Sequence, residues 1–110
     1  MHADEMHRIA ADVSEILKVL ANPNRLMALC ELHDGERSVG ELAERLNVRD
    51  QAMSQQLSIL RAKGFVKTRR DGQTIYYSLA REDIRRIIET LYEQFCVQSR
   101  PPPRRKPLKA

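Results

Sequence analysis

Hydrophobic residues recur every three or four positions along most of this chain, which predicts amphipathic helices. Two such stretches lie near its ends, from about residue 5 to 20 and from about 82 to 97. Their apolar positions are Ile9, Val13, Ile16, Leu17 and Leu20 in the first, and Ile84, Ile87, Ile88, Leu91 and Phe95 in the last. Another helix is predicted from Pro23 to His33, because Asn22 can cap it and proline is tolerated at a first helical position.

The segment from Ser38 to Gly64 predicts two short helices joined by a tight turn. Ser38 and Glu41 have the spacing of a capping box, so a helix is expected to begin at Val39. The pattern breaks after residue 46, and Asp50 offers a second N-cap. The second helix is expected to run to about residue 63, where Gly64 can adopt the left-handed conformation that ends helices. The two helices together predict a helix-turn-helix.

After Gly64 the hydrophobic period shortens to two, which predicts β-strands. Residues 65–70 and 73–79 flank Asp71-Gly72, a dipeptide that favours a tight hairpin turn with positive φ at both central residues. The predicted fold is therefore mostly α with a small β-hairpin, in the order α-α-α-α-β-β-α. This order is that of a winged helix-turn-helix, a DNA-binding unit. Reading two half-sites one DNA turn apart requires a homodimer, and the amphipathic helices at the two ends offer the seam.

Candidate DNA contacts follow from side-chain chemistry. Short or planar polar side chains on the outer face of the second helix suit base edges of double-stranded operator DNA, and these are Gln51, Ser54 and Gln55. Basic side chains at the end of that helix and on the wing suit phosphates, and these are Arg61, Lys63, Lys67, Arg69 and Arg70. Residues 61–70 contain no acidic residue. The alternative interpretation of such a run is an ordinary solvated surface.

The net charge of +4 is weaker support for DNA binding than it first suggests. Five basic residues and no acidic ones follow Gln98, so the remainder of the chain has a net charge of −1. We therefore divide the chain into a DNA-binding and dimerisation domain, residues 1–98, and a basic, proline-rich tail, residues 99–110, which we expect to be disordered. No membrane span or signal peptide is recognisable, which predicts a cytoplasmic protein. Enzymatic activity, cofactors and a complete metal-ligand set are not expected.

Three sequence segments, in this order, resemble those of the ArsR/SmtB repressors: residues 21–26 (ANPNRL), 60–66 (LRAKGFV) and 71–79 (DGQTIYYSL). The resemblance extends from about residue 13 to 96. It implies a homodimer, joined through the first and last helices, that represses an operon until an inducer binds. Residues 51–57 match the family's recognition helix, and Gln56 stands where many relatives have histidine. The operator sequence therefore cannot be transferred.

The inducer class depends on the two cysteines. The Cys-x-Cys and the Asp/His and His/Glu pairs of the family's metal sensors are absent, although the two thiols and three histidines leave an unusual soft-metal site open. Cys30 and Cys96 instead resemble the thiol pair of the BigR, SqrR and HlyU subgroup, which implies sensing of reactive sulfur species or oxidants. At least one thiol should then be partly accessible and have a lowered pKa. The alternative is a DNA-binding protein with inert, buried cysteines.

Overall fold

The computed structural model describes residues 1–97, and the predicted basic tail lies outside the described residues. The elements, in chain order, are α1 (Ala3–Leu20), α2 (Pro23–His33), β1 (Arg37–Ser38), α3 (Val39–Leu46), α4 (Asp50–Ala62), β2 (Val66–Asp71), β3 (Thr74–Leu79), α5 (Glu82–Tyr92) and the π-helical turn η1 (Glu93–Val97). This order confirms the predicted winged helix-turn-helix fold. None of the described helices is both long and apolar enough to cross a membrane.

Local capping chemistry sets where the helices begin. The Asn22 side chain accepts hydrogen bonds from the backbone N–H groups of Asn24 and Arg25, at 3.0 and 3.1 Å. Both hydrogen bonds of the predicted capping box between Ser38 and Glu41 are present, so α3 begins at Val39 as expected. The prediction for α4 is wrong in detail. Asp50 is the first helical residue, the cap position belongs to the residue before it, and no side chain caps this helix.

The sheet contains one strand more than the hairpin predicted from sequence. The two-residue strand β1 pairs antiparallel with β3, which gives the order β1-β3-β2. A two-residue strand has no period of its own, so only its pairing with β3 defines it. The hairpin turn also lies one residue later than predicted. Asp71 pairs with Thr74 within the ladder, and Gly72, with a φ of 66°, is the first central residue of the turn. Glycine at this position is typical of a type II′ turn.

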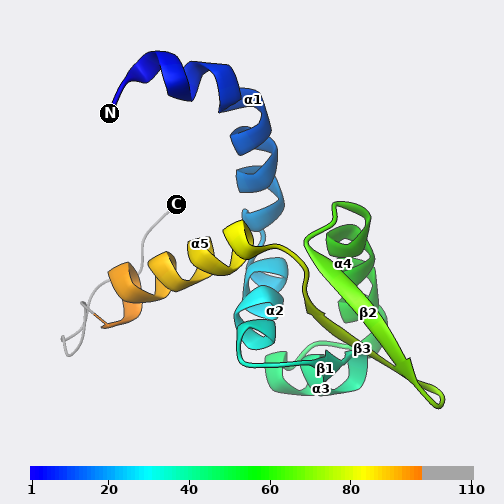
Figure 1. Cartoon of the computed structure of the whole chain (residues 1–110). Coiled ribbons are helices and arrows are strands. Elements are labelled where there is room, and N and C mark those ends of the chain that lie inside the picture. The colour runs from blue at the N-terminus through cyan, green and yellow to red at the C-terminus, as the bar shows by residue number, and fades with distance from the viewer. Residues whose placement is uncertain (98–110) are drawn as a thin grey trace.

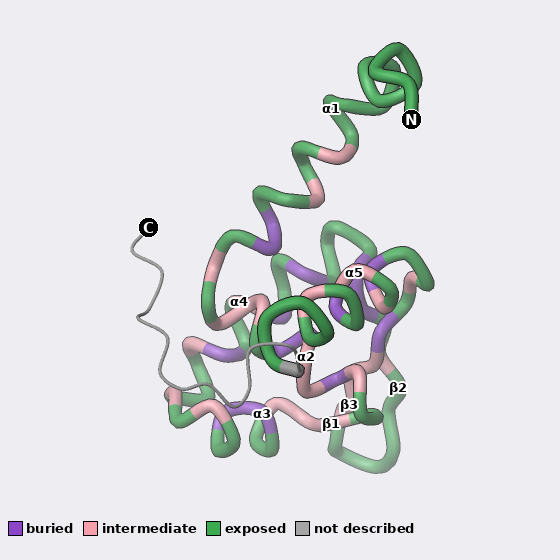
Figure 2. Tube along the Cα trace, turned by 90° about the vertical axis from the view of Figure 1, so that its left-hand side faces the viewer, coloured by how far each residue is buried: buried purple, intermediate pink, exposed green. Residues whose placement is uncertain are grey.

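The hydrophobic core lies between α2, α3, α4, the sheet and the start of α5 (Figure 2). Its fully buried large side chains are Leu29, Leu32, Leu42, Met53, Leu57, Leu60 and Ile84. α1 joins this core through its C-terminal end, where Val19 and Leu20 are buried and Ile16 packs against the core, and the N-terminal part of the helix extends away from the body (Figures 1 and 2). Of the apolar stripe predicted for α1, Leu20 is buried, Val13 and Ile16 are partly buried, and Ile9 and Leu17 are exposed, at 45% and 54%.

The last helix differs from the prediction at its C-terminal end. A continuous α-helix was expected to about Val97, but α5 ends at Tyr92 and the chain continues as the π-helical turn η1. A π-helical turn shifts the angular position of the residues after it relative to an α-helix. Sequence periodicity cannot reveal such a change, because a five-residue turn spans barely one period. The change matters here because Cys96 lies in η1.

Candidate functional site

The outer face of α4 carries the side chains predicted to read bases. Gln51, Ser54 and Gln55 are exposed, whereas Met53 and Leu57 are fully buried on the opposite face. The burial of this inner face fixes the rotation of α4 on the core, so the polar side chains point outward. The three residues are thus available to a DNA major groove, and base contact remains their predicted role.

The predicted phosphate-binding residues differ in whether a carboxylate already neutralises them. All five are exposed, and among the described residues Arg61, Lys63, Lys67 and Arg70 form no ion pair with a carboxylate. Arg69 instead donates from Nε and Nη2 to the Glu36 carboxylate, with the shortest distances at 2.9 and 2.8 Å, and its guanidinium lies 5.0 Å from the centre of the Tyr76 ring. Hydrogen bonding from Arg69 lowers the pKa of Glu36. Sequence reasoning missed this partner because Glu36 lies 33 residues away in the chain.

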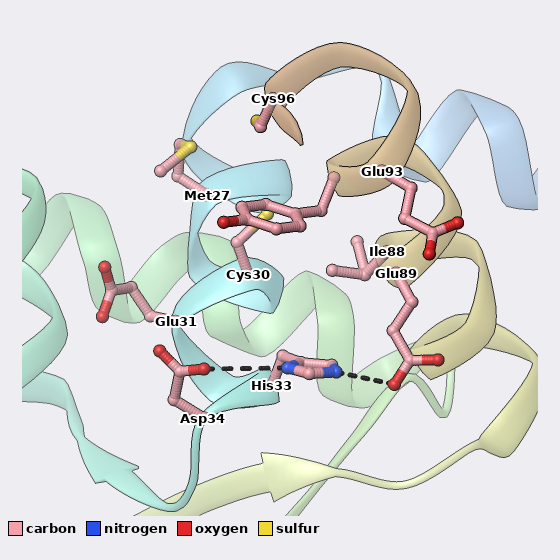
Figure 3. A pocket seen from close by; sticks show the side chains of 10 residues that line it. Met27, Cys30, Glu31, His33, Asp34, Ile88, Glu89, Glu93 and Cys96 are labelled. Atoms are coloured by element: carbon pink, nitrogen blue, oxygen red, sulfur yellow. Dashed lines mark hydrogen bonds and ion pairs between the residues drawn. The ribbon is translucent and has the colours of Figure 1, made fainter. Parts of the chain in front are cut away.

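The two cysteines line one open pocket between α2 and the α5–η1 segment, with a volume of about 840 Å³ (Figure 3). Its lining residues are Met27, Cys30, Glu31, His33, Asp34, Ile88, Glu89, Tyr92, Glu93 and Cys96. Cys30 is partly buried on α2 and Cys96 is exposed on η1, and both are free thiols. The tertiary structure thus brings the predicted sensor pair to one place from elements 66 residues apart.

The environment of the two thiols differs. Burial raises the pKa of Cys30, and the negative charges of the Cys96 thiolate, Glu31 and Asp34 raise it further. The lowered pKa expected of a reactive thiol is therefore not found at Cys30. Its thiolate is disfavoured at neutral pH, whereas Cys96 is open to solvent. A reagent that enters the pocket accordingly meets Cys96 as the more accessible thiol.

His33 connects the two walls of this pocket (Figure 3). Its Nε2 lies 2.8 Å from Glu89 Oε2 on α5, and its Nδ1 lies 3.7 Å from Asp34 Oδ1. Arg85 Nη1 also donates to the His33 carbonyl, at 3.4 Å. These contacts hold the end of α2 against α5, the two elements that carry or lead to the cysteines. Within residues 1–97, no group of three or more His, Cys, Asp or Glu side chains has the arrangement of a metal site.

Comparison with known proteins gives this geometry a context. Residues 22–68 match the model of the arsR family of bacterial regulatory proteins. The chain is 48% identical over 91 residues to the biofilm growth-associated repressor of Agrobacterium fabrum, covering 83% of this chain and 78% of that protein. Two similar solved structures are reduced HlyU from Vibrio cholerae (42% identity, TM-score 0.79, 84% of this chain and 97% of that chain) and the repressor BigR from Xylella fastidiosa (40% identity, TM-score 0.83, 87% and 98%).

Proposed function

Since the chain belongs to the arsR family and is a DNA-binding winged helix-turn-helix transcriptional regulator, we propose that its Cys30 and Cys96 thiols switch its affinity for operator DNA. The observation that carries this proposal is the shared pocket. The two cysteines of the chain line one open cavity, and the charge of Cys96 acts on Cys30. Cysteines that only fill the hydrophobic core would not be expected to line a solvent-open pocket together.

The different environments support an order of reaction with a persulfide donor, RSSH. The exposed Cys96 thiolate attacks the outer sulfur of the donor, which forms a Cys96 persulfide and releases RS⁻, and RS⁻ then takes up a proton. The Cys30 thiolate next attacks Cys96 Sγ and expels HS⁻, which leaves as H₂S. The two thiols are oxidised by two electrons to a disulfide, and the donor is reduced to RSH and H₂S. A peroxide would accept the same two electrons and leave as water.

A longer sulfur bridge is the alternative product. With a second donor molecule, the net reaction of the two thiols yields a trisulfide, two RSH and one H₂S. A direct disulfide requires the two Cα atoms to lie within about 7 Å, whereas an added sulfur atom spans a wider gap. The mass of the linked product therefore reports how closely α2 and η1 approach each other.

We also propose that the functional unit is a cytoplasmic homodimer that represses transcription when its thiols are reduced. The exposed apolar side chains of α1 and of the end of α5 support the dimer, among them Met6, Ile9, Leu17 and Tyr92. A covalent link between α2 and η1 would change how α5 sits on the helix-turn-helix. In a dimer joined through α1 and α5, that shift would alter the spacing of the two recognition helices. A loss of 1.4 kcal/mol in operator binding is tenfold.

The test combines intact-mass spectrometry with operator binding by the same samples. Reduced wild type should bind the operator, and treatment with a persulfide or with peroxide should yield an intrasubunit link between Cys30 and Cys96 and release the DNA. Cys30→Ser and Cys96→Ser should each bind like the reduced wild type and fail to release. Full release by either single variant, or release without the mass link, would replace the thiol switch by the inert-cysteine interpretation.

A further inference from the structure

Glu31 lies beside the thiol pocket and also contacts two elements of the DNA-binding unit. It follows Cys30 on α2 and is one of the pocket's lining residues (Figure 3). Arg45 on α3 donates from Nε to Glu31 Oε1 at 2.6 Å. Arg37 on β1 brings its Nε to 3.4 Å from the same oxygen. One carboxylate thus joins the pocket to the first helix of the helix-turn-helix and to the sheet.

Burial distinguishes the contact of Glu31 with Arg37 from an ordinary surface ion pair. The Glu31 side chain is 19% exposed and that of Arg37 is 21% exposed. Arg37 Nε is buried and, among the described residues, has no hydrogen-bond partner, so Glu31 supplies its nearby counter-charge. A partly buried charge that loses its partner is costly, so Arg37 should follow the carboxylate when it moves. Arg45 is half exposed and is held to the carboxylate by its hydrogen bond of 2.6 Å.

Both arginines lie on elements that contact the predicted DNA-binding elements, which are α4 and the wing. Arg45 belongs to α3, which packs on the recognition helix α4. Arg37 pairs with Tyr77 of β3, and Tyr77 pairs with Thr68 of β2, so β1 is continuous with the wing. Glu31 therefore contacts α3 and β1 directly, and each of these elements packs on or pairs with a DNA-binding element, α4 or the wing.

We propose that Glu31 is a positioning residue that transmits a change at the Cys30 and Cys96 pair to both α3 and the wing. This inference rests on the proposed thiol switch and assigns its route to the DNA-binding surface. A link from Cys30 to η1 displaces the last turns of α2, and Glu31, one residue further on, moves with them. Its carboxylate then draws Arg45 and Arg37 along, which reorients α3 and the sheet together. Without this carboxylate, α2 can shift while the helix-turn-helix stays in its binding orientation.

The measured quantity is the release ratio, which is the operator Kd of the fully linked protein divided by that of the reduced protein. A wild-type ratio on the order of 100-fold is typical of coupled sites. Glu31→Gln should reduce the ratio to about tenfold or less, with the same Cys30 to Cys96 mass link. Arg45→Gln should reduce it part of the way, because it removes only the α3 contact, and Arg45→Lys should retain most of it.

Glu44→Gln is the matched control. Glu44 is exposed on α3, and its substitution removes the same charge, so it should leave the release ratio at the wild-type value. If Glu31 merely supports the fold, Glu31→Gln should weaken operator binding by the reduced and the linked protein by the same factor and leave the release ratio unchanged. Should Glu31→Gln destabilise the chain, Arg45→Gln provides the second measurement, because the Arg45 side chain is 50% exposed.

The outcomes separate the two proposals. Linked Glu31→Gln and Arg45→Gln proteins that release the operator as fully as wild type overturn the role of Glu31 and leave the thiol switch intact. A wild-type protein that neither links nor releases overturns the thiol switch and, with it, this route. A lower ratio in both variants, with unchanged linkage and an unchanged Glu44→Gln ratio, supports Glu31 as the positioning residue.

Discussion

Arg25 Nη1 donates a hydrogen bond of 3.0 Å to Gln56 Oε1, which ties the first turn of α2 to the recognition helix α4. The same guanidinium donates from Nε to the Val19 carbonyl at 2.7 Å, in the last turn of α1. Three helices therefore meet at one side chain. Since α1 is the helix we assign to the dimer seam, Arg25 links the proposed interface to the predicted recognition helix.

This contact predicts a measurable coupling between Arg25 and Gln56. Hydrogen bonds to charged groups contribute about 1.5–3 kcal/mol, and contacting pairs typically couple by 0.5–3 kcal/mol. In a double-mutant cycle of Arg25→Lys and Gln56→Ala, we expect a coupling energy of about 1–2 kcal/mol in the free energy of unfolding by urea. The same cycle with Gln55→Ala, at the exposed neighbouring position, should be additive. Additive free-energy changes for Arg25→Lys and Gln56→Ala would contradict a stabilising contact between Arg25 and Gln56.

The recognition helix and the wing should contribute differently to DNA binding. If Gln51, Ser54 and Gln55 contact base edges as predicted, alanine at any of them should cost about 1–3 kcal/mol on the operator and little on random DNA. Alanine at Lys67 or Arg70 should weaken binding to the operator and to random DNA equally. It should also lower the slope of log affinity against log salt concentration by about one unit per lost phosphate contact. Equal losses on operator and random DNA for both groups would refute this division.

Arg69 should behave differently from the other two wing residues, because Glu36 already neutralises it. Arg69→Ala is expected to change the salt slope less than Lys67→Ala or Arg70→Ala. Glu36→Gln should free the guanidinium for a phosphate and steepen the salt slope by about one unit. Glu44→Gln, with the same charge change on α3, should raise affinity without that steeper slope. A salt slope unchanged by Glu36→Gln would mean that Arg69 does not reach DNA.

The two thiols should react with iodoacetamide at different rates. At pH 7 to 8 we expect Cys96 to be modified at least about tenfold faster than Cys30, since Cys96 is exposed and burial raises the pKa of Cys30. Because a raised pKa keeps the thiol protonated, the Cys30 rate should continue to rise with pH above about 8.5, where an ordinary thiol levels off. Mass spectrometry of wild type and Cys96→Ser across pH 7 to 10 tests this. A Cys30 rate that levels off near pH 8 would contradict the effect of burial.

The same pKa shift makes a prediction for stability. A folded-state pKa that is raised favours the protonated thiol, so its contribution is complete below the pKa of the unfolded chain, about 8.5, and is lost as pH rises toward the folded value. The free energy of unfolding of reduced wild type should therefore fall more steeply above pH 8.5 than that of Cys30→Ser. Parallel pH profiles for the two proteins would show that Cys30 does not contribute.

The exposed stripe of α1 predicts the effect of a charge in the proposed dimer seam. Leu17→Glu should shift the protein from dimer to monomer in sedimentation at micromolar concentration, because a charge would have to be buried between two chains. The fold should survive, since the side chain is 54% exposed in the single chain. Ala11→Glu, on the opposite face of α1, should remain dimeric. A wild-type protein that sediments as a monomer would reject the proposed dimer.

What the sequence alone determined was local in character. The capping box at Ser38 and Glu41, the Asn22 cap and the change of period after Gly64 correctly gave the helices, the hairpin and hence the winged helix-turn-helix. These signals depend on residues a few positions apart, whose hydrogen bonds and side-chain spacing are fixed by the geometry of one element. The outward face of α4 could also be predicted from the sequence, because burial of its apolar positions determines the rotation of the helix.

Tertiary structure decided every feature that depends on distant partners. β1 exists as a strand only through its pairing with β3, and the ion pair of Arg69 with Glu36 joins residues 33 positions apart. The sequence supplied the two cysteines, but the packing of α2 against α5 and the turn η1 placed them in one pocket. Burial there sets the raised pKa of Cys30. Desolvation and long-range contacts are properties of the assembled core, which is why no local pattern encodes them.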